Sequence, residues 1–125
     1  QKAVNMQKLP ADACQISELI AATRAEGETA LAVMPEDLVG YVRQYDASIR
    51  LLYGRRSKSE KPVRKIRRQM RKEQPKIKKL IRRIRQQGVN YLVFLADEQQ
   101  DTKIRRNGFE KIGKVGGYSV YKDKW

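Results

Sequence analysis

The spacing of apolar residues predicts helices in the first third of the chain. Residues 3–9 alternate loosely and could form a first strand that ends at Pro10. Asp12 is a suitable N-cap for a helix that extends to Gly27 through the apolar residues Ile16, Leu19 and Ile20. Pro35, followed by two acids, predicts the start of a second helix, because both features favour a first turn. The core residues expected in this second helix are Leu38, Tyr41 and Val42.

A strand and a basic helical segment are predicted in the middle of the chain. Residues 48–53, SIRLLY, form the strand, and Gly54 closes it. The apolar residues that follow keep helical register on both sides of Pro75, and they are Val63, Ile66 and Met70, then Ile77, Leu80, Ile81 and Ile84. Because proline interrupts helical hydrogen bonding, we expect a sharp kink or two helices, with Pro75 at the first position of the second helix. Gly88 ends that helix.

The last third predicts a buried strand, a short helix and a hairpin. Residues 91–96, YLVFLA, are all apolar, which is typical of a strand buried on both faces. Residues 48–96 therefore predict a strand, a helical crossover and a parallel central strand. A short polar helix follows, and two strands then meet at Gly116-Gly117. The predicted ranges are 98–106 for the helix, and 109–115 and 118–122 for the strands.

Together these elements predict a single α/β (α+β) domain over residues 1–125, with a mixed sheet of about five strands. Hydrophobic residues make up 40% and charged residues 34% of the 125 residues, which fits one moderate core with a highly charged exterior. The chain has no histidine and a single cysteine, Cys14, which excludes an internal disulfide, His-ligated metal sites and His-based catalysis. No apolar run approaches the roughly 20 residues that cross a bilayer, so we expect no transmembrane segment.

Positive charge is concentrated in one stretch of the chain. Residues 55–87 contain 16 Lys or Arg against two acids, Glu60 and Glu73, and so carry a net charge of +14. The whole chain also has a net charge of +14, which leaves the remaining residues electrically balanced. A concentrated basic stripe indicates a binding partner more strongly than a basic pI alone does.

Opposite the apolar stripes we expect a cationic ridge made of Arg64, Lys65, Arg68, Lys72, Lys79, Arg82 and Arg83. Solvent-exposed helix faces usually carry both positive and negative charges, whereas this face has almost no acids to relieve the repulsion between its basic side chains. A polyanion, above all the phosphate backbone of DNA or RNA, is the simplest partner, and about six to ten phosphate contacts would make binding strongly salt-dependent. An acidic protein or an anionic membrane surface is the alternative. Known sequence-reading motifs are absent, so we expect backbone binding with weak sequence preference.

The C-terminal stretch YLVFLADEQQDTKIRRNGFEKIGKVGGYSVYK, residues 91–122, resembles the end of the GNAT-type N-acetyltransferase fold. In that family a buried strand and a short helix lead through Gly-Phe into a final hairpin, and Gly108-Phe109 matches this step. Asp97 stands where the family commonly has Asn, Gln100 where it has Ala, and Lys103-Ile104 where it has a Leu-Tyr pair. The resemblance implies a GNAT-like C-terminal half.

The resemblance also implies acetyl-CoA as cofactor, but two departures point to a shortened, inactive relative. Ile104 takes the place of the tyrosine that often acts as general acid, which leaves that role vacant. The family holds the coenzyme A pyrophosphate on a Gly-rich turn, whereas residues 54–60 carry bulky side chains, although Arg55, Arg56 and Lys58 could still attract phosphate. A similar pattern occurs in small internal virion proteins of short-tailed phages, which implies a virion component near the genome.

Other candidate residues have a structural interpretation beside the functional one. Four acids near the first two helices could supply a general base, but helix-terminal and surface charge is the simpler interpretation; they are Glu26, Glu28, Glu36 and Asp37. We interpret Cys14 as a small core residue. Strand packing is expected for Tyr91, Tyr118 and Tyr121, and the alternative is that Tyr118 and Tyr121 stack on bases with Trp125.

Three hypotheses about function follow. The first is a non-enzymatic nucleic-acid-binding protein, without a cofactor, in a virion or cytoplasmic nucleoprotein assembly, with Arg55, Arg56, Lys58 and the cationic ridge on the phosphate backbone. The second is a GNAT-family acyltransferase that uses acetyl-CoA. The third is an interaction module that docks on an acidic protein.

Overall fold

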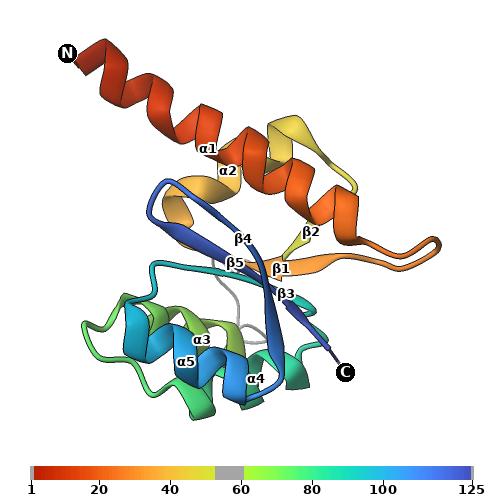
Figure 1. Cartoon of the computed structure of the whole chain (residues 1–125), viewed down its shortest axis with the longest axis vertical. Coiled ribbons are helices and arrows are strands. Elements are labelled where there is room, and N and C mark those ends of the chain that lie inside the picture. The colour runs from red at the N-terminus through yellow and green to blue at the C-terminus, as the bar shows by residue number, and fades with distance from the viewer. Residues whose placement is uncertain (1, 53–60, 125) are drawn as a thin grey trace.

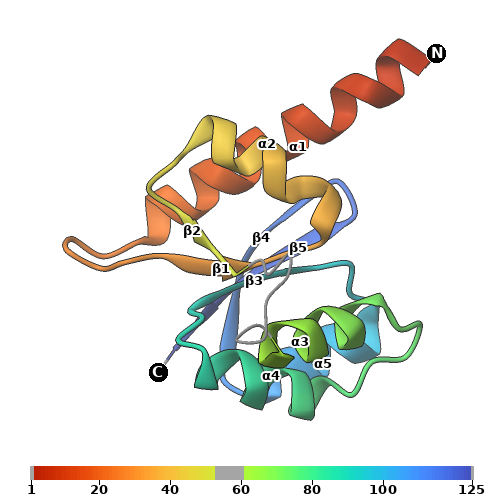
Figure 2. The same cartoon turned by 180° about the vertical axis from the view of Figure 1, so that it is seen from behind.

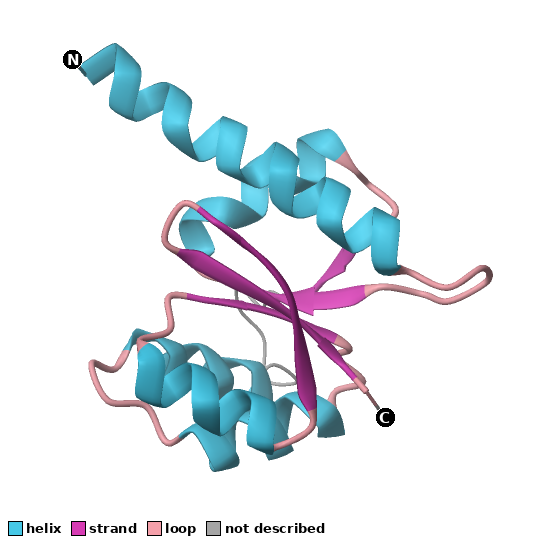
Figure 3. Cartoon of the chain, viewed as in Figure 1, coloured by secondary structure: helices cyan, strands magenta, loops and turns pink. Residues whose placement is uncertain are grey.

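A five-stranded mixed sheet lies between two layers of helices in this computed structural model, which describes residues 2–52 and 61–124 (Figure 1). Its strands are β1 (Leu31–Val33), β2 (Arg50–Leu51), β3 (Tyr91–Phe94), β4 (Phe109–Val115) and β5 (Tyr118–Asp123). Its helices are α1 (Lys2–Thr23), α2 (Glu36–Tyr45), α3 (Lys61–Arg71), α4 (Ile77–Gln86) and α5 (Glu98–Arg106). Helices α1 and α2 cover one face of the sheet, and α3, α4 and α5 cover the other (Figures 2 and 3).

The strand order β2-β1-β3-β5-β4 joins a parallel half to an antiparallel half. Strand β1 pairs in parallel with both β2 and β3, while β5 pairs in antiparallel fashion with β3 and β4. The mixed five-stranded sheet predicted from sequence is therefore confirmed. The predicted parallel relation of residues 48–53 to the central strand also holds, but β1 lies between them.

The core is split by the sheet into two clusters that β3 connects. Tyr91 and Val93 face α1 and α2, whereas Leu92 and Phe94 face α3, α4 and α5. All four side chains are buried, with exposed fractions of 0–4%. The prediction of a central strand buried on both faces is confirmed for residues 91–94, but the strand ends there and Leu95 is 56% exposed, which corrects the predicted range 91–96.

The N-terminal prediction is wrong. Residues 3–9 are helical rather than extended, α1 runs through Pro10, and Asp12 lies inside the helix instead of capping it. A proline removes one helical hydrogen bond, but the helix beyond it is held by Ile16 and Ile20, which are fully buried against the sheet. Helix α1 packs closely on β4 at Gly113. A side chain at this position would place its Cβ 2.7 Å from Leu19 Cδ1, which is too close for a normal contact.

The first strand is instead β1, which lies between the two predicted N-terminal helices, where no strand was predicted. It is only three residues long, and it lies between two parallel neighbours, where Ala32 and Val33 are buried. Alternation cannot develop over so few residues, so no local pattern marks this strand.

The basic segment forms two helices rather than one kinked helix. Helix α4 is N-capped by Lys76, so Pro75 lies outside the helix and not at its first position, which corrects that prediction. The buried Gln69 accepts a hydrogen bond from the Lys76 backbone N–H to its Oε1 at 3.1 Å, which holds the turn between the helices. The predicted apolar stripes are confirmed, because Ile66, Ile77 and the rest of the set are buried, apart from the partly exposed Met70.

The predicted order of the C-terminal elements is confirmed. Asp97 caps α5, and with Gln100 it forms a reciprocal capping box: Asp97 Oδ1 accepts the Gln100 N–H at 2.8 Å and Gln100 Oε1 accepts the Asp97 N–H at 3.0 Å. Strands β4 and β5 meet at Gly116-Gly117, where Gly116 takes the left-handed conformation at φ +58° that suits a tight hairpin.

Candidate nucleic-acid interface

Helices α3 and α4 pack against the sheet by their apolar stripes, which directs their basic side chains outward. On α3 the stripe is Val63 and Ile66, and on α4 it is Ile77, Leu80, Ile81 and Ile84, all buried. With about 3.6 residues per turn, the remaining positions of each helix lie on the solvent side. The fold thus turns one stretch of basic sequence into one outer surface of the helical layer (Figure 1).

Three arginines of this segment are held in ion pairs, although Arg71 is still exposed. Arg67 and Arg71 both donate to Glu36 Oε1 at the start of α2. Arg85 donates two hydrogen bonds of 3.0 Å to the carboxylate of Asp123 in β5. The sequence prediction had left these three out of the ridge, and the structure gives them anchoring contacts.

The cationic ridge has no anionic partner within the described residues. None of its seven members forms an ion pair there, and Arg64, Lys65, Arg68, Lys72 and Arg82 are exposed, while Lys79 and Arg83 are half-buried. Arg55, Arg56 and Lys58, also predicted to bind phosphate, lie outside the described residues. The ridge therefore presents concentrated positive charge without internal compensation.

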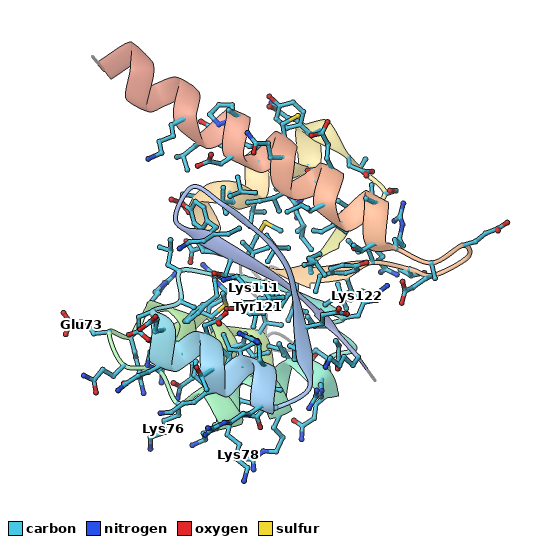
Figure 4. The ribbon with its side chains drawn as sticks, viewed as in Figure 1. Glu73, Lys76, Lys78, Lys111, Tyr121 and Lys122 are labelled. Carbon is cyan, nitrogen blue, oxygen red and sulfur yellow. The ribbon has the colours of Figure 1, made fainter. Side chains whose placement is uncertain are left out.

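The structure adds three lysines that the sequence prediction missed. Lys61, Lys76 and Lys78 are exposed beside the ridge, and they too lack an ion pair among the described residues. Lys76 and Lys78 point away from the body, and Glu73 lies at the turn between the helices (Figure 4). Helical spacing alone does not place Lys76, because it lies in the turn that Pro75 creates.

Positive charges from both helices converge around Lys79. Its pKa lies below the ordinary value, chiefly because Arg83 and then Lys76 are close, with partial burial, Arg82 and Lys72 adding to the effect. Lys72 follows α3 whereas Lys79 and Arg83 belong to α4, so the two helices form one electrostatic surface. An anion in this position would be attracted by several groups together.

Two hollows on this side of the molecule are lined by cations. One, of about 310 Å³, lies between the start of α3 and the end of α4, and Lys61, Lys65 and Arg83 meet there beside Gln86 and Gln87. The other, of about 430 Å³, lies between α4 and α5 and is lined in part by Lys78 and Arg82. Ammonium, guanidinium and amide donors around open hollows suit phosphate oxygens.

The four acids considered as a general base have different surroundings, and three of them contact different partners. Glu28 pairs with Lys122 Nζ at 3.0 Å, Glu36 with Arg67 and Arg71, and Asp37 Oδ2 accepts the Tyr118 hydroxyl at 3.4 Å. Glu26 is exposed in the loop after α1. Among the described residues, no group of three or more His, Cys, Asp or Glu is arranged to hold a metal ion.

The remaining candidates are packed to different degrees. Tyr91 and Tyr121 are fully buried and Tyr118 is 8% exposed, so the expected packing is confirmed and stacking on bases by Tyr118 and Tyr121 is wrong. Trp125 lies outside the described residues. Cys14 is half-buried on α1 and belongs to neither core cluster, so the interpretation as a core residue is wrong.

Comparison with protein-family models, with curated proteins and with solved structures finds no match to this chain. The GNAT resemblance therefore stays a prediction. Ile104, at the place of the family's tyrosine, is fully buried in α5. None of the helices formed by the described residues combines the length and apolar character that crossing a membrane requires.

Proposed function

We propose that this protein binds the phosphate backbone of nucleic acid through the cationic ridge, without catalysing a reaction. The observation that carries the proposal is the positive charge of the cationic ridge, whose members form no ion pair among the described residues. Acids in this domain pair readily where cations are structural, as Glu36 and Asp123 do. The ridge has no such partner among the described residues, so its repulsion in the free protein is relieved when a polyanion binds.

The geometry favours backbone contacts over the reading of base sequence. The ridge cations belong to α3, to α4 and to the turn between them, so they are distributed over two packed helices rather than along one projecting helix. Such a surface suits phosphates that follow one another along a strand. A role as a basic structural component of a virion or another nucleoprotein assembly follows as part of the same proposal.

The test is the affinity for mixed-sequence duplex DNA and single-stranded RNA between roughly 50 and 200 mM salt. We expect a log-log slope steeper than about −4, since each phosphate contact contributes about −0.9 for duplex DNA. A variant with Arg64→Gln, Arg68→Gln, Lys79→Gln and Arg82→Gln should bind more weakly, with a slope on duplex DNA shallower by up to about 3.6 units.

The matched control removes four cations elsewhere through Lys103→Gln, Arg106→Gln, Lys114→Gln and Lys124→Gln. All four are exposed, and none forms an ion pair among the described residues. The two variants have equal net charge, so an equal loss of affinity would overturn the assignment to the ridge. Negligible binding of either nucleic acid by the unaltered protein at roughly 50 mM salt would reject the proposal in favour of an acidic protein partner.

A further inference from the structure

We propose that the hollow between the start of α2 and the end of α3 receives an unpaired nucleobase that carries an amino group. This inference rests on the proposed function, because it adds a base site to the backbone surface. The hollow has a volume of about 300 Å³ and is lined by Met34, Pro35, Glu36, Asp37, Arg67, Met70 and Arg71. That volume is at the lower end of small-molecule sites, which suits one planar ring system.

The position of the hollow follows from the topology of the sheet. Met34 and Pro35 directly follow β1, and β1 and β3 are adjacent parallel strands whose next helices, α2 and α5, lie on opposite faces. In open α/β sheets, ligands bind outside the carboxyl ends of strands at such a switch point. The hollow lies at the carboxyl end of β1, which is one side of this switch point.

The lining suits an aromatic ring. Met34, Pro35 and Met70 supply apolar contacts, and thioether groups interact favourably with aromatic rings. Arg71 is well exposed, with 64% of its side chain accessible, and a guanidinium plane can stack on a base. Stacking of this kind accepts any base, so it does not by itself create a preference.

The preference comes from two carboxylates at the edge of the hollow. Glu36 Oε1 accepts from Arg67 and Arg71, and Asp37 Oδ2 accepts from Tyr118. Within the described residues, Glu36 Oε2 and Asp37 Oδ1 have no hydrogen-bond donor. The amino group of an unpaired cytosine, adenine or guanine offers two N–H donors to these two oxygens, whereas unpaired thymine and uracil offer only the single imide N3–H.

The hollow is continuous with the cationic ridge. At 100° per residue, Arg67 and Arg71 flank Arg64 and Arg68 on the circumference of α3, on the side toward α2. A strand whose phosphates lie on Arg64 and Arg68 therefore passes the opening of the hollow. Base insertion requires an unpaired strand, because a duplex holds its bases in the stack.

The test compares single-stranded (dC)12 with (dT)12 at neutral pH, since both carry the same phosphates. We expect about five- to tenfold tighter binding of (dC)12, from one charge-assisted hydrogen bond. The Glu36→Gln variant should bring the ratio close to one. If that variant fails to fold, Asp37→Asn should reduce the same ratio. The control Arg68→Gln should weaken both oligomers equally and leave their ratio unchanged.

The outcomes separate this inference from the proposed function. Strong, salt-dependent binding of both oligomers with equal affinity would overturn the base site and leave the backbone surface intact. No binding of either oligomer would reject both. A last experiment measures the effect of deoxycytidine monophosphate on Tm at millimolar concentration. If this free nucleotide raises Tm while (dC)12 and (dT)12 bind with equal affinity, the insertion of a base from a strand is overturned.

Discussion

At the scale of single residues, what a charged side chain contacts decides its role. Lys122 shows how a cation becomes structural: its Nζ donates to the Thr23 carbonyl at 2.6 Å and to Glu28 Oε1 at 3.0 Å, and it lies 5.6 Å from the centre of the Tyr91 ring. These contacts join the end of α1 and the loop after it to β5 (Figure 4). A lysine of the ridge has no such set of contacts among the described residues.

Glu28 provides the residue-scale prediction. Its pKa is lowered, mainly because the Ala25 backbone N–H and then Lys122 donate hydrogen bonds to the carboxylate. A carboxyl whose pKa is lower in the folded state stabilises the fold above its unfolded pKa of about 4.3, and this contribution is lost as pH falls through the lowered pKa. We expect Glu28→Gln to reduce the free energy of unfolding by about 1 kcal/mol at pH 7.

Thermal unfolding of both proteins between pH 7 and pH 2 measures this effect. The difference in stability between the unaltered protein and Glu28→Gln should shrink as pH falls below about 4. Glu26→Gln is the matched control, since Glu26 is exposed in the same loop and should change stability little. A difference for Glu28→Gln that persists unchanged at pH 2 would contradict the ionic interpretation.

At the scale of elements, α4 has an anchoring side and a binding side. Arg85 fixes the helix to the hairpin: Nε and Nη2 donate to the two oxygens of Asp123, and Nη2 also donates to the Asn107 carbonyl at 2.6 Å. The guanidinium lies 5.1 Å from the centre of the Phe109 ring. The Asp123 side chain is only 7% exposed, so it depends on this partner.

The element-scale prediction concerns Arg85→Lys. Lysine keeps the charge but cannot form the planar fork, so we expect the free energy of unfolding to fall by about 1–3 kcal/mol. Denaturant unfolding measures this loss, and nucleic-acid affinity of the folded protein should not change. Arg82→Lys, on the outer side of the same helix, should alter stability by less than about 0.5 kcal/mol. Equal losses from the two substitutions would show that Arg85 is not an anchor.

At the scale of the whole molecule, charge is divided between the layers of the fold. The ridge and its neighbouring lysines lie on the α3 and α4 side, while acids such as Glu18, Asp46 and Glu28 lie with the α1 and α2 layer. Like charges so close together destabilise the folded state, in which they cannot separate. The proposed binding to nucleic acid and the stability of the free protein therefore make opposite demands on this surface.

Lys79→Gln tests that opposition. Glutamine matches lysine in helix propensity, so relief of repulsion dominates and Tm should rise at low salt, with a smaller rise at high salt. Because the Lys79 pKa is lowered on folding, the unaltered protein should gain stability as pH rises from that pKa toward the unfolded value of about 10.4, and the advantage of the variant should close.

The same variant should bind nucleic acid more weakly. Lys103→Gln on α5 is the control, since Lys103 is exposed away from α3 and α4 and should give a smaller rise in Tm. Thermal unfolding at about 20 mM and 500 mM salt supplies the comparison. A lower Tm for Lys79→Gln at low salt would contradict the presence of repulsion at this site.

The local sequence pattern was enough to predict those elements whose own residues show a clear periodicity, apolar run or turn motif. The stripes of α3 and α4, the apolar run of β3 and the Gly116-Gly117 turn each express one rule of short range, and each is observed. The basic residues that form the ridge could also be chosen from helical spacing, because the apolar stripe fixes which side faces water.

Only tertiary packing decided the N-terminal helix, β1 and the hollow beside α3. Helix α1 continues through Pro10 and β1 forms from three residues because each is held by surfaces that come from distant parts of the chain. Glu36 and Met70 are far apart in sequence, yet they line one hollow because the start of α2, at the carboxyl end of β1, lies next to the end of α3. Charge and helical periodicity can be recognised in short segments of sequence. Strand order depends instead on the balance of contacts over the whole domain, and no short segment of sequence contains those contacts.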